Sequence, residues 1–122
     1  MPQRFIKINQ LKPFKRNVNI RALVMKIGET REGTSKRTGE PFRLTEVTLG
    51  DETGIVLATM WGETVNSVSE GHTYEFIGIS TTLFQGSLRV NINNRTKIRE
   101  SENQIDKDAV NTKRNMSIPR RR

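Results

Sequence analysis

Few side chains in this 122-residue chain are suited to catalysis or metal binding. It has no cysteine and one histidine, His72, which excludes thiolate nucleophiles and the usual Cys- or His-containing zinc sites. Asp51 and Glu52 are adjacent carboxylates, but neighbouring turn or strand side chains diverge, and no base or nucleophile accompanies them. We expect Asp51 to cap a turn and His72 to lie on the surface. The sequence therefore predicts a protein that is not an enzyme and needs no metal ion or cofactor.

Two aromatic residues, Trp61 and Phe84, indicate instead the binding of a flat ligand. Trp61 ends an apolar run, residues 55–61, that has no helix cap and no helical period. In a strand, alternate side chains share a face, so the apolar residues at positions 56, 58 and 60 form a core face and the indole points the other way. The indole either packs under a loop or serves as a platform on which a base stacks.

Basic side chains could supply contacts to phosphates. The chain has 21 Lys and Arg against 13 Asp and Glu, a net charge of +8, which favours a polyanionic partner such as nucleic acid. No basic helix that could fill a major groove is predicted, which disfavours sequence-specific recognition of a duplex. The candidate contacts to phosphates or bases are Arg31, Lys36, Arg37, Arg43, Arg89 and Asn91.

Much of the positive charge lies at the C-terminus. The last fourteen residues, 109–122, carry five of the eight net charges and no acidic side chain. From residue 99 onward, large apolar side chains are few and show no periodicity, which predicts disorder. We expect this tail to add electrostatic affinity without specificity. Its cations are Lys113, Arg114, Arg120, Arg121 and Arg122.

Short strands separated by turns must position these residues. The first, residues 17–28, loses its alternation at residues 25–27, as expected where a strand bends or bulges. A polar loop with two glycines and a proline, residues 29–41, follows it. Residues 62–71 predict one helical turn or a capping loop, whereas residues 81–85 are too weakly patterned to predict a strand. The other predicted strands cover residues 42–49, 55–61, a stretch from 73, and 87–92.

These elements divide the chain into three parts. We expect an N-terminal lead-in over residues 1–16 that packs on the barrel, a nucleic-acid-binding domain over residues 17–98, and a disordered basic tail over residues 99–122. A long bent first strand and a helical turn between strands three and four indicate an all-β, five-stranded Greek-key OB-fold barrel, a fold that binds oligonucleotides or oligosaccharides. An SH3-like barrel is the alternative, but it normally lacks the excursion between strands three and four.

Several short motifs support this fold and add a family resemblance. They are Leu11-Lys12-Pro13, Gly50-Asp51-Glu52-Thr53-Gly54, Trp61-Gly62, Glu70-Gly71, Thr81-Thr82 followed by Phe84-x-Gly86, and Lys97-Ile98. Together they resemble the archaeal single-OB single-stranded DNA-binding proteins, which are similar to replication protein A domains and to the single-OB subunit of the human SOSS complex. The resemblance covers about residues 6–100.

The resemblance implies a function and two site residues. Aromatic side chains that stack on bases in this family carry over to Trp61 and Phe84. A further aromatic on strand four falls on Ser80, which cannot stack, so the chain departs from the family there. The family coats or protects exposed single strands in DNA replication, recombination or repair.

We therefore predict a single-stranded DNA-binding protein that is monomeric in solution. Its expected partners are single-stranded DNA and replication or repair proteins, and we expect no binding to a membrane. No apolar run approaches the roughly 18 residues of a membrane span, and no signal-peptide pattern is present, so we expect a cytoplasmic, nucleoid-associated protein. One alternative is an RNA-binding OB protein, because stacking and phosphate contacts do not distinguish the sugar. Another is a protein-interaction subunit with Trp61 as its interface anchor.

Overall fold

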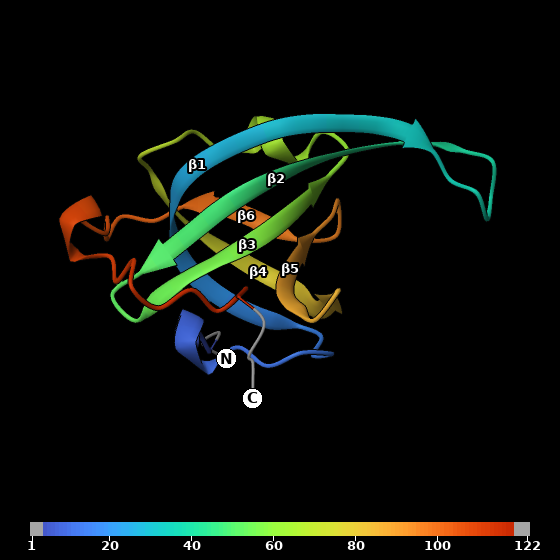
Figure 1. Ribbon diagram of the computed structural model, residues 1–122. Helices are drawn as coiled ribbons and strands as arrows, with labels where there is room; N and C mark the ends of the chain where they lie inside the picture. Colours follow the sequence, from blue (N-terminus) through green and yellow to red (C-terminus); the bar gives the residue numbers. More distant parts are fainter. Residues whose placement is uncertain (1–3, 119–122) are drawn as a thin grey trace.

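Six strands form one curled sheet in the computed structural model, which describes residues 4–118 (Figure 1). The sheet order is β1-β2-β3-β5-β4-β6, and a further pairing of β1 with β4 closes the first five strands into a ring. β3 and β5 are parallel and the other pairs are antiparallel. This is the OB-fold barrel that the sequence predicts. The strands are β1 (Val18–Thr34), β2 (Pro41–Asp51), β3 (Gly54–Trp61), β4 (Thr73–Phe84), β5 (Ser87–Ile92) and β6 (Lys97–Glu100).

Helical structure in the described part of the chain is limited to three short 3₁₀ turns. They are η1 (Ile8–Gln10), η2 (Thr64–Ser67) and η3 (Lys107–Ala109). The turn η2 lies between β3 and β4, where the sequence predicts one helical turn. Across residues 4–118, no helix has the length and apolar character needed to cross a membrane.

β1 is a long strand that bends sharply. Its register against β2 shifts twice, between Val24 and Lys26 and between Ile27 and Thr30, which matches the predicted bend. Such bulges bend a strand and increase its twist. The first half of β1 therefore pairs with β4 and the second half with β2, which closes the barrel.

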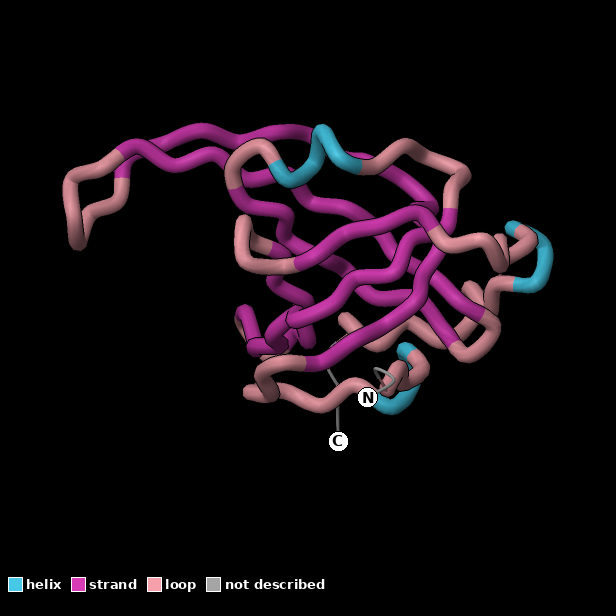
Figure 2. The backbone as a smooth tube through the Cα atoms, turned by 180° about the vertical axis from the view of Figure 1, so that it is seen from behind, coloured by secondary structure: helices cyan, strands magenta, loops and turns pink. Residues whose placement is uncertain are grey.

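Beyond the end of β3, β1 and β2 continue together as a two-stranded arm, residues 32–43, that projects from the barrel (Figures 1 and 2). The sequence predicts a polar loop over residues 29–41, but only residues 35–40 lie between the two strands. The strands support each other by backbone pairing and by an ion pair of Arg43 with Glu32 (2.8 Å). Such pairing does not require apolar side chains.

The lead-in reaches the core through its apolar residues. Ile8 and Leu11 are buried with the inward side chains of the strands. Asp51 tethers this segment, because its Oδ2 accepts a hydrogen bond from the N–H of Ile8 (2.9 Å). Its Oδ1 accepts from the N–H and the hydroxyl of Thr53, at 2.7 and 2.6 Å. Asp51 thus caps its turn, as predicted, and also holds the lead-in on the barrel.

The other two residues weighed for catalysis lie at the surface. Glu52 accepts a hydrogen bond from Lys7 Nζ (2.9 Å), which lowers the pKa of its carboxyl group. His72 Nδ1 lies 3.0 Å from Glu100 Oε2, and both side chains are half exposed. Among the described residues, no group of three or more His, Cys, Asp or Glu side chains could hold a metal ion.

Residues 111–117, which we call the strap, lie along β3 in place of the disorder that their composition predicts. A parallel bridge joins Asn115 to Ile55 through two backbone hydrogen bonds of 2.8 Å. The N–H of Leu57 donates to the hydroxyl of Ser117 (2.8 Å). Pairing of β3 with β5 begins only at Leu57, so the backbone groups before it have no partner on β5. The strap supplies hydrogen bonds to these groups at the start of β3.

Candidate nucleic-acid interface

A groove of about 300 Å³ crosses the outer face of the barrel, over β2, β3, β5 and β4. Side chains alternate between the two faces of a strand, so the positions between the core residues line this groove. It lies on the face and beside the loops through which OB-folds bind oligonucleotides. Its lining residues are Arg31, Leu44, Glu46, Thr59, Trp61, Thr82, Leu83, Phe84, Arg89 and Asn91.

Aromatic side chains stand at the two ends of the groove. At one end, Trp61 of β3 pairs with Leu44 of β2, which pairs in turn with Arg31 of β1. At the other end, Phe84 of β4 pairs with Ser87 at the start of β5. The two rings are therefore separated along the strands rather than stacked on each other.

One row of side chains across the groove is polar. Carboxylate, hydroxyl and amide groups there can bind the edges of bases, but they offer no flat apolar surface on which a base could stack. Ser80 belongs to this row and is partly exposed. The row crosses β2, β3, β5 and β4 as Glu46, Thr59, Asn91 and Ser80.

The indole of Trp61 faces the groove and does not belong to the core. The side chain is 39% exposed, whereas Val56, Ala58 and Met60 are completely buried behind it, in the alternation that the sequence predicts. The ring of Phe42 lies edge-on to it, with 6.3 Å between the centroids and 67° between the planes. This contact supports the indole from one side and leaves it open toward the groove.

Phe84 and Arg89 form the other end. Phe84 is 57% exposed at the end of β4, which extends to this residue although the sequence pattern there is weak. The guanidinium carbon of Arg89 lies 5.6 Å from the centroid of its ring, a cation–π arrangement. Nη1 of Arg89 also donates to Oε2 of Glu46 (3.0 Å), and the Arg89 side chain is only 18% exposed. The cation is therefore held in place, with its charge partly compensated.

The other predicted contacts are divided between the groove and the arm. Arg31 and Asn91 line the groove together with Trp61, Phe84 and Arg89. Lys36 and Arg37 are exposed in the loop at the tip of the arm. The structure therefore brings five predicted site residues together and places two more at the end of a projecting hairpin.

Three further predicted cations in the described part of the chain, Arg43, Lys113 and Arg114, do not line the groove. Arg43 alternates with the groove-lining positions of β2 and donates to Glu32 from Nε (3.0 Å) and Nη2 (2.8 Å). Lys113 and Arg114 are exposed on the strap, beside the beginning of β3. The residues Arg120–Arg122 lie outside the described part of the chain.

Sequence reasoning missed two residues that shape the groove, Phe42 and Glu46. Both lie on the same face of β2 as Leu44, and the pairing of Leu44 with Trp61 puts this face beside the indole. The signal was present in the alternation of the strand predicted over residues 42–49. The sequence alone did not show which face of that strand meets the outer face of β3.

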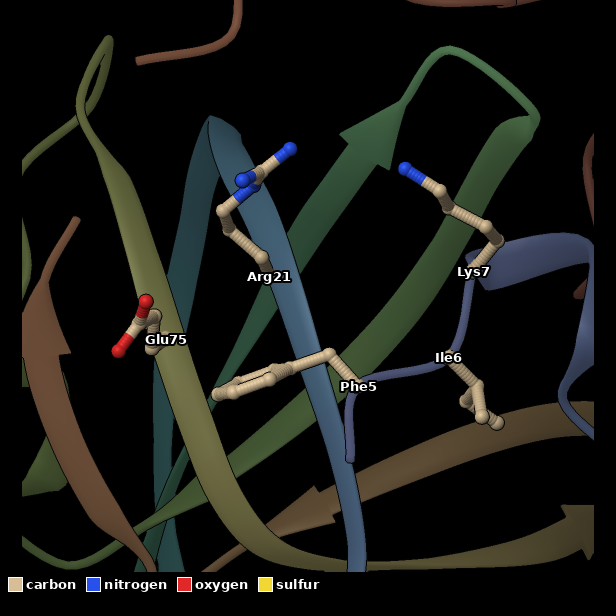
Figure 3. Close-up of a pocket in the computed structure, with 5 residues that line it drawn as sticks. All are labelled: Phe5, Ile6, Lys7, Arg21 and Glu75. Carbon is tan, nitrogen blue, oxygen red and sulfur yellow. The ribbon is translucent and has the colours of Figure 1, made fainter. Parts of the chain in front are cut away.

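A smaller hollow of about 150 Å³ lies away from the groove, between the lead-in, β1 and β4 (Figure 3). Lys7 is paired with Glu52, and Glu75 is paired with Arg99, so these charges are already compensated. The Nε of Arg21 is buried without a hydrogen-bond partner. The hollow shares no lining residue with the groove. Its lining residues are Phe5, Ile6, Lys7, Arg21 and Glu75.

Comparison with known sequences identifies the family. A sequence model described as single-stranded DNA binding protein Ssb-like, OB fold, matches residues 11–100. The chain belongs to this family. A single-stranded DNA binding protein Ssb from Saccharolobus solfataricus is 34% identical over 95 residues, which are 78% of this chain and 63% of that protein. The chain thus spans less than two thirds of this relative's length. The match confirms the resemblance that the motifs indicate.

Solved structures share the fold of this Ssb-like chain. The solution structure of a hypothetical protein from Arabidopsis thaliana has a TM-score of 0.74 and 24% identity, covering 98% of this chain and 86% of that one. The second OB-fold domain of replication protein A from Methanococcus maripaludis has a TM-score of 0.67 and 24% identity, covering 84% of this chain and 100% of that one. The Ssb-like family is defined by binding and not by a reaction, which agrees with the prediction that the protein is not an enzyme.

Proposed function

We propose that this Ssb-like protein binds single-stranded DNA in the groove between Trp61 and Phe84. The observation that carries the proposal is an open groove with an exposed aromatic ring at each end and Arg31 and Arg89 along it. Proteins that bind single strands without sequence preference combine stacking platforms with a positive path for the backbone. The family match over residues 11–100 and the Saccharolobus relative support the same ligand.

Each group in the groove has a distinct role in this proposal. The rings of Trp61 and Phe84 each stack on a base, a contact worth roughly 1–3 kcal/mol. Arg31 and Arg89 bind phosphates or base edges, and the amide of Asn91 binds a base edge. The other predicted cations add affinity that does not depend on sequence. These are Lys36, Arg37, Arg43, Lys113, Arg114, Arg120, Arg121 and Arg122.

The groove favours an unpaired strand over a duplex. Bases within a duplex are stacked on one another, so they must be unstacked before they can lie against Trp61 or Phe84. The described residues include no helix long enough to enter a major groove. A monomer bound in this way covers and protects exposed strands during replication, recombination or repair, in the cytoplasm at the nucleoid, where it meets the proteins of those processes.

A titration with matched oligomers tests the proposal. We expect oligo-dT to bind more tightly than a duplex of the same length, with a logarithm of affinity that falls by about 0.7 per phosphate contact for each tenfold rise in salt. Fluorescence anisotropy of labelled oligo-dT, oligo-U and duplex DNA at several salt concentrations measures both quantities. Tighter binding of oligo-U would establish an RNA-binding protein. Absence of binding to all three would leave a protein-interaction subunit.

Glu46→Gln is expected to strengthen the binding of oligo-dT by roughly 1.4- to 5-fold at low salt. The carboxylate of Glu46 lies 3.0 Å from Nη1 of Arg89 and competes with phosphate for this cation. The size of the gain follows from the worth of partly exposed ion pairs, about 0.2–1 kcal/mol. Glu75→Gln is the matched control, because it removes the same charge from a pair with Arg99 that lies away from both the groove and the arm. If Glu46→Gln weakens binding, the carboxylate instead holds Arg89 in a productive position.

A further inference from the structure

Phe42 is an exposed aromatic residue next to the groove but not among its lining residues. It lies on β2 past the end of β3, within the arm, and is 37% exposed. A single exposed apolar side chain on a protein surface is ordinary. Phe42, however, contacts Trp61 edge-to-face at the end of the groove, so the two rings form a continuous aromatic surface that leads from the barrel onto the arm.

The arm is shaped to hold this ring. The cross-strand partner of Phe42 is Gly33 of β1. A Cβ atom at Gly33 would lie 2.8 Å from Cζ of Phe42, closer than real carbon contacts, so the absence of a side chain there gives the ring its place. A ring that is already packed against backbone loses less conformational freedom when a ligand binds.

The lining of the groove holds no third aromatic ring on which a base could stack. The row between Trp61 and Phe84 is made of carboxylate, hydroxyl and amide side chains, as described above. A third stack therefore has to lie beyond one of the ends. On the Trp61 side, Phe42 provides the next ring and the arm provides cations, with Lys36 and Arg37 exposed at its tip.

We propose that Phe42 is a third stacking platform and that the bound strand leaves the barrel past Trp61 and follows the arm toward its basic tip. The inference rests on the proposed function, because it extends the same binding site. The number of nucleotides that the protein contacts would then depend on the arm. The third stacking contact would come from Phe42 of β2 and not from a residue of the groove.

A length series of oligo-dT, from about four to about sixteen nucleotides, tests the inference. For the wild type, affinity should rise with length until the strand reaches the arm. For Phe42→Ala that gain should be lost, which leaves long oligomers roughly 5- to 100-fold weaker and the shortest ones unchanged. Phe42→Tyr, which keeps a flat ring, should behave as wild type. Phe42→Leu, which keeps apolar bulk beside Trp61, should behave as Phe42→Ala.

Four results would overturn the inference. An equal loss at all lengths, or full rescue by Phe42→Leu, would show that Phe42 only supports the indole of Trp61. Wild-type affinity of Phe42→Ala for every length, with normal quenching of tryptophan emission, would overturn the third platform and leave the proposed function standing. Failure of the wild-type protein to bind any oligomer would overturn the proposed function itself. Phe5→Ala, which removes a ring of the lead-in that lines the hollow away from the groove, is the matched control and should bind as wild type.

Discussion

Trp61→Ala should weaken the binding of oligo-dT by roughly 1–3 kcal/mol while the barrel stays folded. The indole faces the groove. The core behind it is formed by Val56, Ala58 and Met60, which the substitution leaves in place. The edge-to-face contact with Phe42 is lost, which lowers the free energy of unfolding by about 0.5–1.5 kcal/mol. Calorimetric titration measures the affinity and urea unfolding measures the stability.

The tryptophan also provides its own control, because it is the only one in the chain. Stacking of a base on the indole should quench the emission of the wild-type protein on titration with oligo-dT. Trp61→Phe keeps a smaller ring and should lose less affinity than Trp61→Ala. An unfolded variant would contradict the exposed position of the indole, and an emission that ignores bound DNA would contradict its role as a platform.

The fold could be predicted because its signals are local. The glycines and Asp51 around the turn between β2 and β3 specify a reversal, and the alternation that ends at Trp61 specifies which face is buried. The loss of alternation in the first strand corresponds to its two register shifts. Each of these features depends on a few neighbouring residues, so the sequence contains them without knowledge of the tertiary structure.

The strap shows what the sequence could not reveal. Ser117 accepts a hydrogen bond from the N–H of Leu57 and donates one to the carbonyl of Leu88, although neither residue is near it in sequence. The strap is held by such polar contacts and by the buried residue just before it, Val110, whose side chain lies over Gly50. This kind of stabilisation leaves no hydrophobic period, so composition alone predicts disorder.

The candidate site was predicted in part for a related reason. Residue type identified the exposed rings and cations, but the pairing of strands decides which of them share a surface. Counting charges did not show that Arg43 is paired with Glu32 or that Arg89 is paired with Glu46. Only the register places Phe42 beside Trp61, since the two residues are nineteen positions apart in the chain.

Asp51→Ala is expected to lower the free energy of unfolding by about 2–4 kcal/mol. The carboxylate is 1% exposed and accepts hydrogen bonds from Ile8 and Thr53, one of them a buried backbone N–H. Alanine leaves that N–H without an acceptor and releases the lead-in, whose Ile8 and Leu11 pack in the core. Urea unfolding of the two proteins measures the difference.

Glu52→Gln is the matched control for this substitution, because it changes the neighbouring acid of the same turn. Its pair with Lys7 is half exposed, so the free energy of unfolding should change by no more than about 0.5 kcal/mol. Asp51 does not line the groove, and folded Asp51→Ala protein should therefore bind oligo-dT as the wild type does. Equal costs for the two substitutions would show that burial of Ile8 and Leu11, and not the carboxylate of Asp51, holds the lead-in on the barrel.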